Sequence, residues 1–350
     1  MKKALFVMLV GFLDLFAPLS LLGQSAERGE GALSKRLDSM EKRLQWLPSI
    51  SGHMSLRYQY EDVSDKNSFD VRRVRLALHG APTSFIDYRL QLELASTPKI
   101  LDAYVRFKIR DWANFQIGQF KVPLSLENPY SPLKMEAIDN AQVITNLTGV
   151  DDIAGVKASG RDIGIAFYGS ALKRDDFSVI EYSLGVFNGA GINRTDDNDS
   201  KDFAARLNVN PLSALTFSAS CYLGYANRTT ETGESYGMGR KRYGAGVRWD
   251  DRLLLVRAEY LYGKTGALES DGWYAIVGYW VTPKVEPVVR YETFRRDRTE
   301  SRSSQTNYMV GVDYWPWDFL RFQFNYTLRT FAEPGKRNEN CLSCQLSLAF

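Results

Sequence analysis

The chain has 350 residues, of which 44% are hydrophobic and 13% aromatic, and its formal net charge is +3. Its mean hydropathy is −0.29, and beyond the N-terminus it has no apolar run of roughly eighteen residues, which excludes a helical membrane protein. The near-neutral charge gives no reason to expect a nucleic-acid partner. The three cysteines, Cys221, Cys341 and Cys344, form no disulfide framework, and nothing in the sequence indicates a metal or another cofactor.

The first residues have the pattern of a secretory signal. Lys2 and Lys3 precede an apolar stretch from Ala4 to Leu13, which is the order of a basic and then a hydrophobic region in exported proteins. We therefore assign residues 1–24 to a signal peptide, with cleavage after Gly23 or Ser25.

Residues 25–49 are expected to form a short periplasmic helix. Apolar side chains recur in a heptad pattern and end before Pro48, at Leu33, Leu37, Met40, Leu44 and Leu47. Two heptads are too few to hold an isolated coiled coil together. The segment is either a self-association element of a trimer or an amphipathic helix that docks on the base of the following domain or lies free.

From about residue 50 to the end, apolar and polar side chains alternate in stretches of roughly ten residues. Leu215–Tyr225 and Leu320–Arg329 are clear examples. Short turns alternate with longer polar segments, among them Asn188–Lys201, Asn227–Lys241 and Gly263–Asp271. The pattern predicts an all-β fold, a transmembrane antiparallel β-barrel of about sixteen strands over residues 50–350, with both ends on the periplasmic side. Fourteen or eighteen strands and a soluble β-sandwich are the alternatives.

The final stretch, Cys341–Phe350, ends the chain on an aromatic residue of its apolar face. We expect Phe350 to be part of the signal that the barrel-assembly machinery reads.

The longest connection is residues 123–155. Pro123, Pro129 and Pro132 stiffen its start, and it also contains many apolar residues. A wholly solvated external loop would not need these, so the composition favours a loop folded into the lumen. An external lid or a contact between subunits is the alternative.

The predicted inner faces of the strands are rich in cations. The alternation places these residues there: Arg57, Arg73, Arg75, Arg89, Arg106, Lys108, Lys121, Arg206, Arg248, Arg257, Arg290, Arg321 and Arg329. Fewer acids share these faces: Glu93, Asp102, Glu181, Glu259, Glu286, Glu292 and Asp313. A cationic excess in a pore favours anions, and guanidinium groups suit phosphate and carboxylate oxygens. Some of these charges are expected to pair with each other, Arg106 with Asp102 and Arg290 with Glu292.

Several segments, taken together, resemble the phosphate-selective porin family (the porin O and P family). They are Phe69–Gly80 (FDVRRVRLALHG), Asp87–Ala95 (DYRLQLELA), Leu101–Val105 (LDAYV), Asn114–Glu127 (NFQIGQFKVPLSLE), Gly160–Gly169 (GRDIGIAFYG), Tyr182–Asn193 (YSLGVFNGAGIN) and Asp202–Leu207 (DFAARL). The resemblance implies a trimer of sixteen-stranded barrels whose third external loop folds inward.

By motif position, Arg73, Arg75 and Lys121 match the cations that guide anions in such porins. We take the anion path to include Arg73, Arg75, Arg89, Arg106, Lys108, Lys121 and Lys134. The long loop also carries five acids, Glu127, Glu136, Asp139, Asp151 and Asp152, which favour a broader anion pore over strict phosphate selectivity.

These features predict a porin of the Gram-negative outer membrane, a water-filled channel through which small solutes diffuse passively, with a preference for anions such as phosphate or polyphosphate-like solutes. Its expected partners are outer-membrane lipid, two further copies of the chain in a homotrimer, and the barrel-assembly machinery. One alternative is a non-conducting scaffold or secretion-associated barrel. An embedded enzyme is the other, but the only histidines, His53 and His79, are predicted near the periplasmic ends of their strands.

Overall fold

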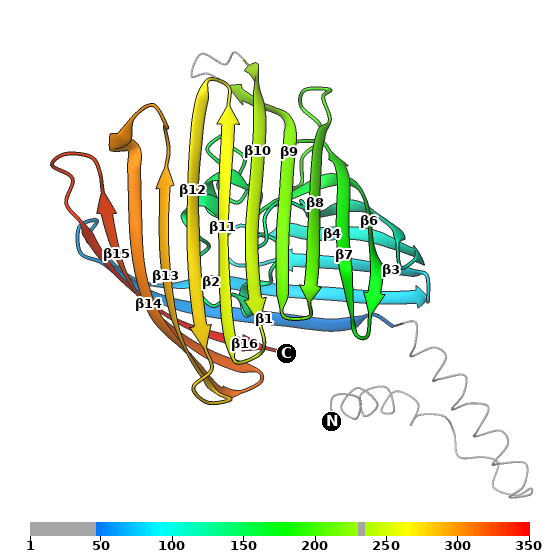
Figure 1. Ribbon diagram of the computed structural model, residues 1–350, viewed down its shortest axis with the longest axis horizontal. Coiled ribbons are helices and arrows are strands. Elements are labelled where there is room, and N and C mark those ends of the chain that lie inside the picture. Colours follow the sequence, from blue (N-terminus) through cyan, green and yellow to red (C-terminus); the bar gives the residue numbers. More distant parts are fainter. Residues whose placement is uncertain (1–46, 230–234) are drawn as a thin grey trace, which may run out of the picture. The chain divides into compact units, whose positions relative to one another are not determined.

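In the computed structural model, which describes residues 47–229 and 235–350, sixteen antiparallel strands form a closed barrel (Figure 1). Each strand pairs with its neighbours in sequence, and β1 pairs with β16, so the predicted fold is confirmed. The strands are β1 (Ser49–Glu61), β2 (Lys66–Thr83), β3 (Ile86–Glu93), β4 (Lys99–Arg110), β5 (Ala113–Lys121), β6 (Arg161–Arg174), β7 (Phe177–Phe187), β8 (Asp202–Leu212), β9 (Leu215–Thr229), β10 (Ser235–Asp250), β11 (Leu254–Thr265), β12 (Leu268–Tyr279), β13 (Val285–Arg295), β14 (Ser304–Trp317), β15 (Leu320–Phe331) and β16 (Glu339–Ala349).

The predicted signal peptide, residues 1–24, and almost all of the predicted periplasmic helix, residues 25–49, lie outside the described residues. Within the described part of the chain, no helix is long and apolar enough to cross a membrane.

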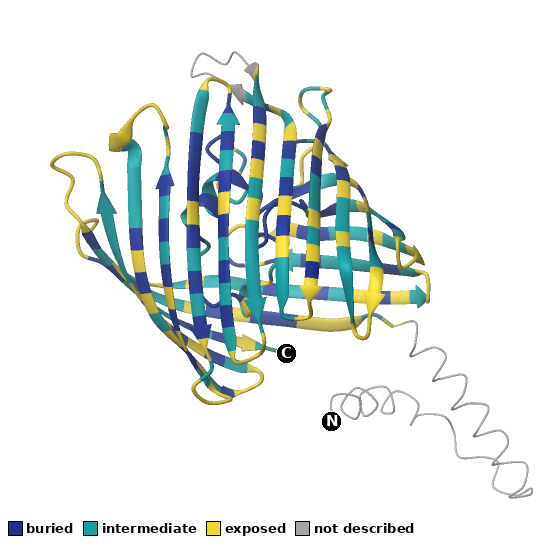
Figure 2. Cartoon of the chain, viewed as in Figure 1, coloured by how far each residue is buried: buried dark blue, intermediate teal, exposed yellow. Residues whose placement is uncertain are grey.

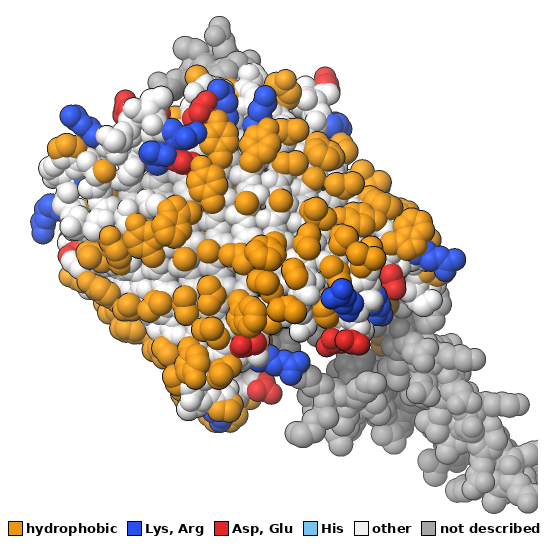
Figure 3. Space-filling model, in the orientation of Figure 1, with side chains coloured by type: hydrophobic (Ala, Val, Ile, Leu, Met, Phe, Trp, Pro, Cys, Tyr) orange, Lys and Arg blue, Asp and Glu red, His pale blue; other side chains and the backbone are white. Residues whose placement is uncertain are grey.

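The side chains alternate between an apolar outer face and a polar inner face, as the period of two predicts. On β15, Phe324 is 42% exposed whereas Arg321 is only 2% exposed. Figure 2 shows this alternation as bands along the strands, and exposed apolar side chains form a broad band across the face of the barrel that Figure 3 shows. A barrel in lipid requires apolar side chains on its outer face and polar side chains on its inner face.

Several strands are longer than predicted at the end that carries the longer loops. The connection between β11 and β12 is only two residues, 266–267, where a loop over Gly263–Asp271 was predicted, and β10 begins at Ser235 rather than after Lys241. The prediction was wrong there because strand ends near the membrane surface are rich in polar and charged residues, as loops are. The backbone of these residues nevertheless stays paired in the sheet.

An irregularity in the pairing of β1 with β2 concentrates arginine on the inner face. Ser55 lies opposite Arg73, but Leu56 lies opposite Val71, so Arg72 is the extra residue of a β-bulge. A bulge of this kind re-aims side chains. Arg72 forms an ion pair with Asp139 of the long connection, and Arg73 shares the inner face with the buried Ser55.

The long connection, residues 122–160 between β5 and β6, packs against inner-face side chains of the barrel. It contains a short 3-10 helix, η1 (Pro132–Lys134), and the helix α3 (Gln142–Leu147), which lies against β11, β12 and β13. One apolar cluster joins the long connection to the inner wall of the barrel. The loop contributes Ala137, Ala141, Val143, Ile144, Leu147 and Ile153, and the wall contributes Leu261, Tyr274, Ile276, Val288, Phe294 and Met309. The apolar content of the loop therefore has a matching patch on the inner wall.

The barrel closes at the C-terminal residue. The amide of Gly52 donates to the carbonyl of Phe350 over 3.0 Å, and the amide of Phe350 donates back to Gly52 over 3.0 Å. A side chain at position 52 would have its Cβ 2.5 Å from the Phe350 ring. The absence of a side chain at Gly52 thus makes room for the terminal aromatic ring at the β1–β16 seam.

Deleting Phe350 is expected to lower the yield of folded barrel, because it removes the last backbone pair of the seam as well as the terminal aromatic residue. The heat-modifiable band in electrophoresis measures this yield. Gly239→Ala is the control, since nothing lies within 4 Å of a Cβ at that position. An unchanged yield without Phe350 would contradict the assigned role.

Candidate functional site

A cavity of about 880 Å³ lies between the first part of the long connection and the inner faces of β2 to β8. Its wall includes eight cationic side chains, Arg75, Arg89, Arg106, Lys108, Arg110, Lys121, Arg161 and Arg206. Of the residues that the structure describes, only three with acidic side chains line it, Asp102, Asp111 and Glu181. The open part of the lumen is therefore bounded by strongly basic surface.

The inner face of β4 sets the spacing of the charges along this cavity. Side chains two residues apart on one face are about 7 Å apart, so Tyr104, Arg106 and Lys108 follow each other along the wall. The Arg106 guanidinium lies 5.2 Å from the Tyr104 ring centroid and 5.8 Å from that of Tyr168. It also donates to the Tyr104 hydroxyl over 2.7 Å. These contacts hold the charge in a fixed orientation.

On this wall, two carboxylates each form ion pairs with two cations. Asp87 lies 3.5 Å from the Arg106 guanidinium and 2.6 Å from the Lys108 ammonium. Asp102 is paired in the same way, 2.7 Å from Arg161 and 3.6 Å from Arg89. One positive charge in each group is therefore left without compensation.

The expected pairing of Arg106 with Asp102 is wrong. Residues four apart on a strand are about 13 Å apart, whereas Asp87 on β3 lies directly opposite Arg106 in the register. The other expected pair exists, because the side chains of Arg290 and Glu292, two residues apart, approach to 3.4 Å.

Three further cationic side chains of the cavity differ in their partners. Arg75 pairs with Glu93 over 2.8 Å. The Lys121 ammonium donates to the carbonyls of Asn128 and Tyr130, each over 2.6 Å, and Arg206 donates to the carbonyl of Ser125 over 3.1 Å. Among the described residues, no carboxylate lies within 4.0 Å of Lys121 or Arg206, so both charges add to the positive surplus while they fix the start of the loop.

The acids of the long connection face arginines of the wall. Arg257 pairs with Glu127 over 3.4 Å and with Glu136 over 2.8 Å. Arg242 pairs with Asp152 over 2.7 Å. The loop carboxylates that suggested a less basic pore are thus largely consumed in attaching the loop to β10 and β11.

Asp139 reaches the opposite side of the lumen, toward β1 and β2. It pairs with Arg72 and lies 3.7 Å from Arg57. Burial alone would raise the pKa of Asp139, but the charges of Arg72, Arg57 and Arg73 hold it well below the ordinary value of 3.8. The carboxylate therefore stays ionised and occupies the densest arginine cluster of the chain.

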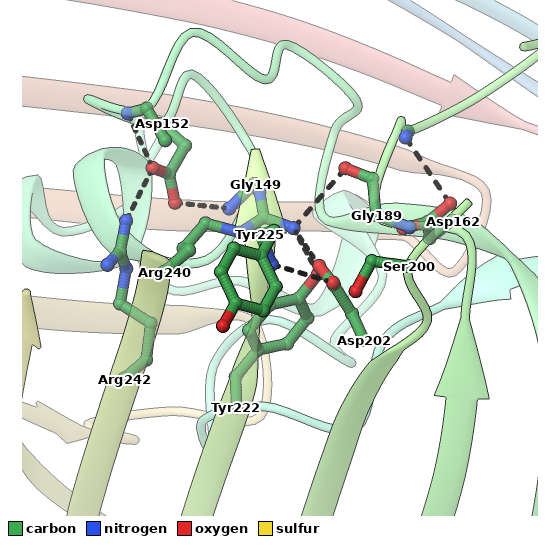
Figure 4. Close-up of polar contacts among 12 residues, drawn as sticks. Gly149, Asp152, Asp162, Gly189, Ser200, Asp202, Tyr222, Tyr225, Arg240 and Arg242 are labelled. Atoms are coloured by element: carbon green, nitrogen blue, oxygen red, sulfur yellow. Dashed lines mark hydrogen bonds and ion pairs between the residues drawn. The ribbon is translucent and has the colours of Figure 1, made fainter. Parts of the chain in front are cut away.

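A second network of hydrogen bonds and ion pairs lies at the end of the barrel that carries the longer loops (Figure 4). It attaches the long connection and the connection between β7 and β8 to β9 and β10. Arg240 pairs with Asp202 over 3.0 Å and contacts the Tyr222 hydroxyl. Asp162 accepts from the Gly189 amide over 2.8 Å. The connection between β7 and β8 is thereby fixed beside the long connection, which Asp152 and Arg242 attach to β10.

The structure brings most of the predicted site residues together. Arg75, Arg89, Arg106, Lys108 and Lys121 line the cavity. Arg73 lies on the inner face beside Arg72, outside the cavity lining. Lys134 is exposed on η1 and is not part of the lining either. Phe350 lies at the seam.

Sequence reasoning missed several charged residues of the inner wall. Arg161 begins β6 directly after the long loop, where the alternation has only just started. Arg240 and Arg242 share the parity of Arg248, which the alternation did place inward, but Arg240 fell within the predicted loop Asn227–Lys241 and Arg242 directly follows it. Asp87 lies at the start of β3 and has the same parity as Arg89 and Gln91.

The sequence of the chain matches the family described as "Phosphate-selective porin O and P" over residues 52–223 and 215–350. The chain belongs to this family. Its fold and family are those of a porin channel of the Gram-negative outer membrane, and the end with longer loops is accordingly the external end. A search of curated proteins found no match.

Solved porins share the fold of this porin at low sequence identity. The trimer form of OmpT from Vibrio cholerae is 10% identical with a TM-score of 0.65, covering 87% of this chain and 99% of that one. The anion-selective porin from Comamonas acidovorans is 11% identical with a TM-score of 0.64, again covering 87% and 99%. The outer membrane channel DcaP of Acinetobacter baumannii is 11% identical with a TM-score of 0.56, covering 87% and 97%.

Replacing Asp139 by Asn is expected to create an anion site in the lumen. Without the carboxylate, Arg72 and Arg73 can accept a solute anion, so phosphate should reduce the chloride conductance at a concentration roughly fivefold lower than in the wild type, which corresponds to about 1 kcal/mol. Single-channel conductance with added phosphate measures the shift. Asp151→Asn is the control, because that acid is exposed and pairs with Lys157.

Acidification should not mimic this substitution. A depressed folded-state pKa contributes stability that is present above the unfolded pKa and is lost only as the pH falls toward the lower folded value. The second proton of phosphate titrates at about pH 7 for both proteins, so the ratio of the phosphate sensitivities of Asp139→Asn and the wild type should be the same at pH 5 as at pH 7. A smaller ratio at pH 5, or equal effects of both Asn variants, would contradict the account.

Proposed function

We propose that this porin conducts small anions passively and prefers them over cations. The observation that carries the proposal is the lining of the cavity, with eight cationic and three acidic side chains. The positive charge of this lining raises the local concentration of anions and opposes the entry of cations.

The proposed mechanism is a sequence of weak contacts rather than one tight site. An anion that enters the cavity exchanges water for guanidinium and ammonium donors at Arg75, Arg106, Lys108 and Arg206. Each exposed charge contact is worth about 1 kcal/mol or less, so the anion is attracted but can leave, as conduction requires.

The solute class follows from how these cations are arranged. They are distributed along the wall, and several share a carboxylate, so they do not converge on one fully desolvated point. This arrangement supports a pore for small anions that include phosphate, and it does not require strict selectivity for phosphate.

We further propose that residues 1–24 are removed on export and that the chain assembles as a homotrimer, with residues 25–49 as a short periplasmic element. The trimer form of OmpT supports the oligomeric state by analogy. Mass photometry of the detergent-solubilised porin tests it: particles with the mass of three chains are expected, and particles with the mass of one chain would contradict the proposal.

Replacing Arg106 and Arg206 together by Gln is expected to lower the anion-to-cation permeability ratio by roughly two- to fivefold per charge, or about 0.5–1 kcal/mol each. Both residues line the cavity. In the described part of the chain, their loss leaves no carboxylate without a partner, because Asp87 keeps Lys108 and Arg206 donates to the carbonyl of Ser125. The reversal potential across a planar bilayer with a KCl gradient reports the ratio.

The matched control is Arg252→Gln, which removes an exposed cation in the turn between β10 and β11. This variant should keep the wild-type ratio. Equal ratios in the double variant and the wild type would show that the cavity cations do not set the selectivity.

A further inference from the structure

The outer face of β10 to β13 carries a charged patch directly above the aromatic part of the apolar band. We name it the rim patch and define it as Lys241, Lys264, Glu269, Asp271, Arg295 and Arg298. Figure 3 shows Lys and Arg side chains gathered here with a few carboxylates, over the external ends of these strands. The position matters because it is the level of lipid headgroups in the outer leaflet.

The strand register places two lysines side by side. Lys241 on β10 lies directly opposite Lys264 on β11, and like charges in direct cross-strand contact are destabilising. Lys264 has a partner, Glu269, at 2.8 Å. Lys241 is exposed and has no ion-pair partner among residues 47–229 and 235–350.

The rest of the rim patch is held rigidly. Asp271 receives two bonds of 2.9 Å from the Arg295 guanidinium and lies 3.5 Å from Arg298. Arg298 also lies 5.3 Å from the centroid of the Tyr262 ring. With four cations and two acids, the patch keeps a positive surplus.

Aromatic side chains continue the patch toward the middle of the membrane. Tyr243 and Tyr262 are opposite each other one row below the lysine pair, and Tyr260 and Trp273 form the next row. Exposed aromatic rings at this level mark the interface between headgroups and acyl chains. A molecule that fits both parts has an anionic headgroup at the lysines and apolar chains beside the rings.

We propose that the rim patch is a binding site for a phosphorylated lipid of the outer leaflet, with its phosphate at Lys241 and Lys264 and its acyl chains along Tyr243 and Tyr262. The phosphate supplies the negative charge that Lys241 lacks among the described residues, and it also screens the repulsion between Lys241 and Lys264. Arg298 stands beside them as a further donor for headgroup oxygens.

The test uses the detergent-purified mature porin, stripped of lipid and then titrated with bisphosphorylated lipid A or with its dephosphorylated form, with bound lipid counted by native mass spectrometry. The wild type should retain the bisphosphorylated form preferentially. Lys241→Gln with Lys264→Gln should weaken that binding roughly tenfold or more, given the usual contribution of a cation near a charged membrane surface.

The control variant is Lys173→Gln with Arg174→Gln, which removes two exposed cations at the periplasmic end of β6 and should bind as the wild type does. Lys241→Gln alone, which breaks no ion pair among the described residues, should weaken binding roughly fivefold and guards against misfolding of the double variant. Equal retention of the two lipids by the wild type, or equal losses in the rim and control variants, would overturn the proposal.

Discussion

The ion pairs between loop carboxylates and wall arginines determine how the lumen is divided. Arg257 is 1% exposed and binds both Glu127, which is also 1% exposed, and Glu136. Removing one partner of such a buried pair costs about 3–5 kcal/mol, because it leaves an uncompensated charge. The loop is therefore fixed against β10 and β11 by interactions that are expensive to break singly, and the apolar cluster around α3 adds to this attachment.

This attachment has an electrostatic consequence for the open part of the lumen. Every loop acid that binds a wall arginine is withdrawn from the cavity on the other side of the loop. What remains there is the wall of β2 to β8, where Asp87 and Asp102 each serve two cations. The loop thus neutralises charge on the side of the wall that it covers, and the uncovered side keeps the positive surplus.

The fold was predictable from sequence because lipid imposes a strict period of two on every strand, and this period extends over most of the chain. It also placed Arg75, Arg89, Arg106 and Lys108 correctly on the inner face. It could not predict the cross-strand partners, since the pairing of Arg106 with Asp87 depends on register. Nor could it place Arg72, because a β-bulge breaks the alternation at that residue.

Charged residues near the external ends of strands were the other source of error. Lys241 and Lys264 were predicted to lie in loops, although their backbones are paired in β10 and β11. A charged residue type is the same whether the side chain faces the lumen, the headgroups or water. Only the three-dimensional structure separates Arg242, which binds Asp152 of the long connection inside the barrel, from the neighbouring Lys241 of the rim patch outside.

The most direct test of the account is the ion selectivity of the wild-type porin, measured as the reversal potential in a planar bilayer with a KCl gradient. The surplus of cations along the cavity predicts a potential of the sign that chloride permeation produces, and it predicts that the preference weakens as the salt concentration rises. A cation-selective pore would contradict the account, because the arginines of the wall would then serve only as partners of the acids.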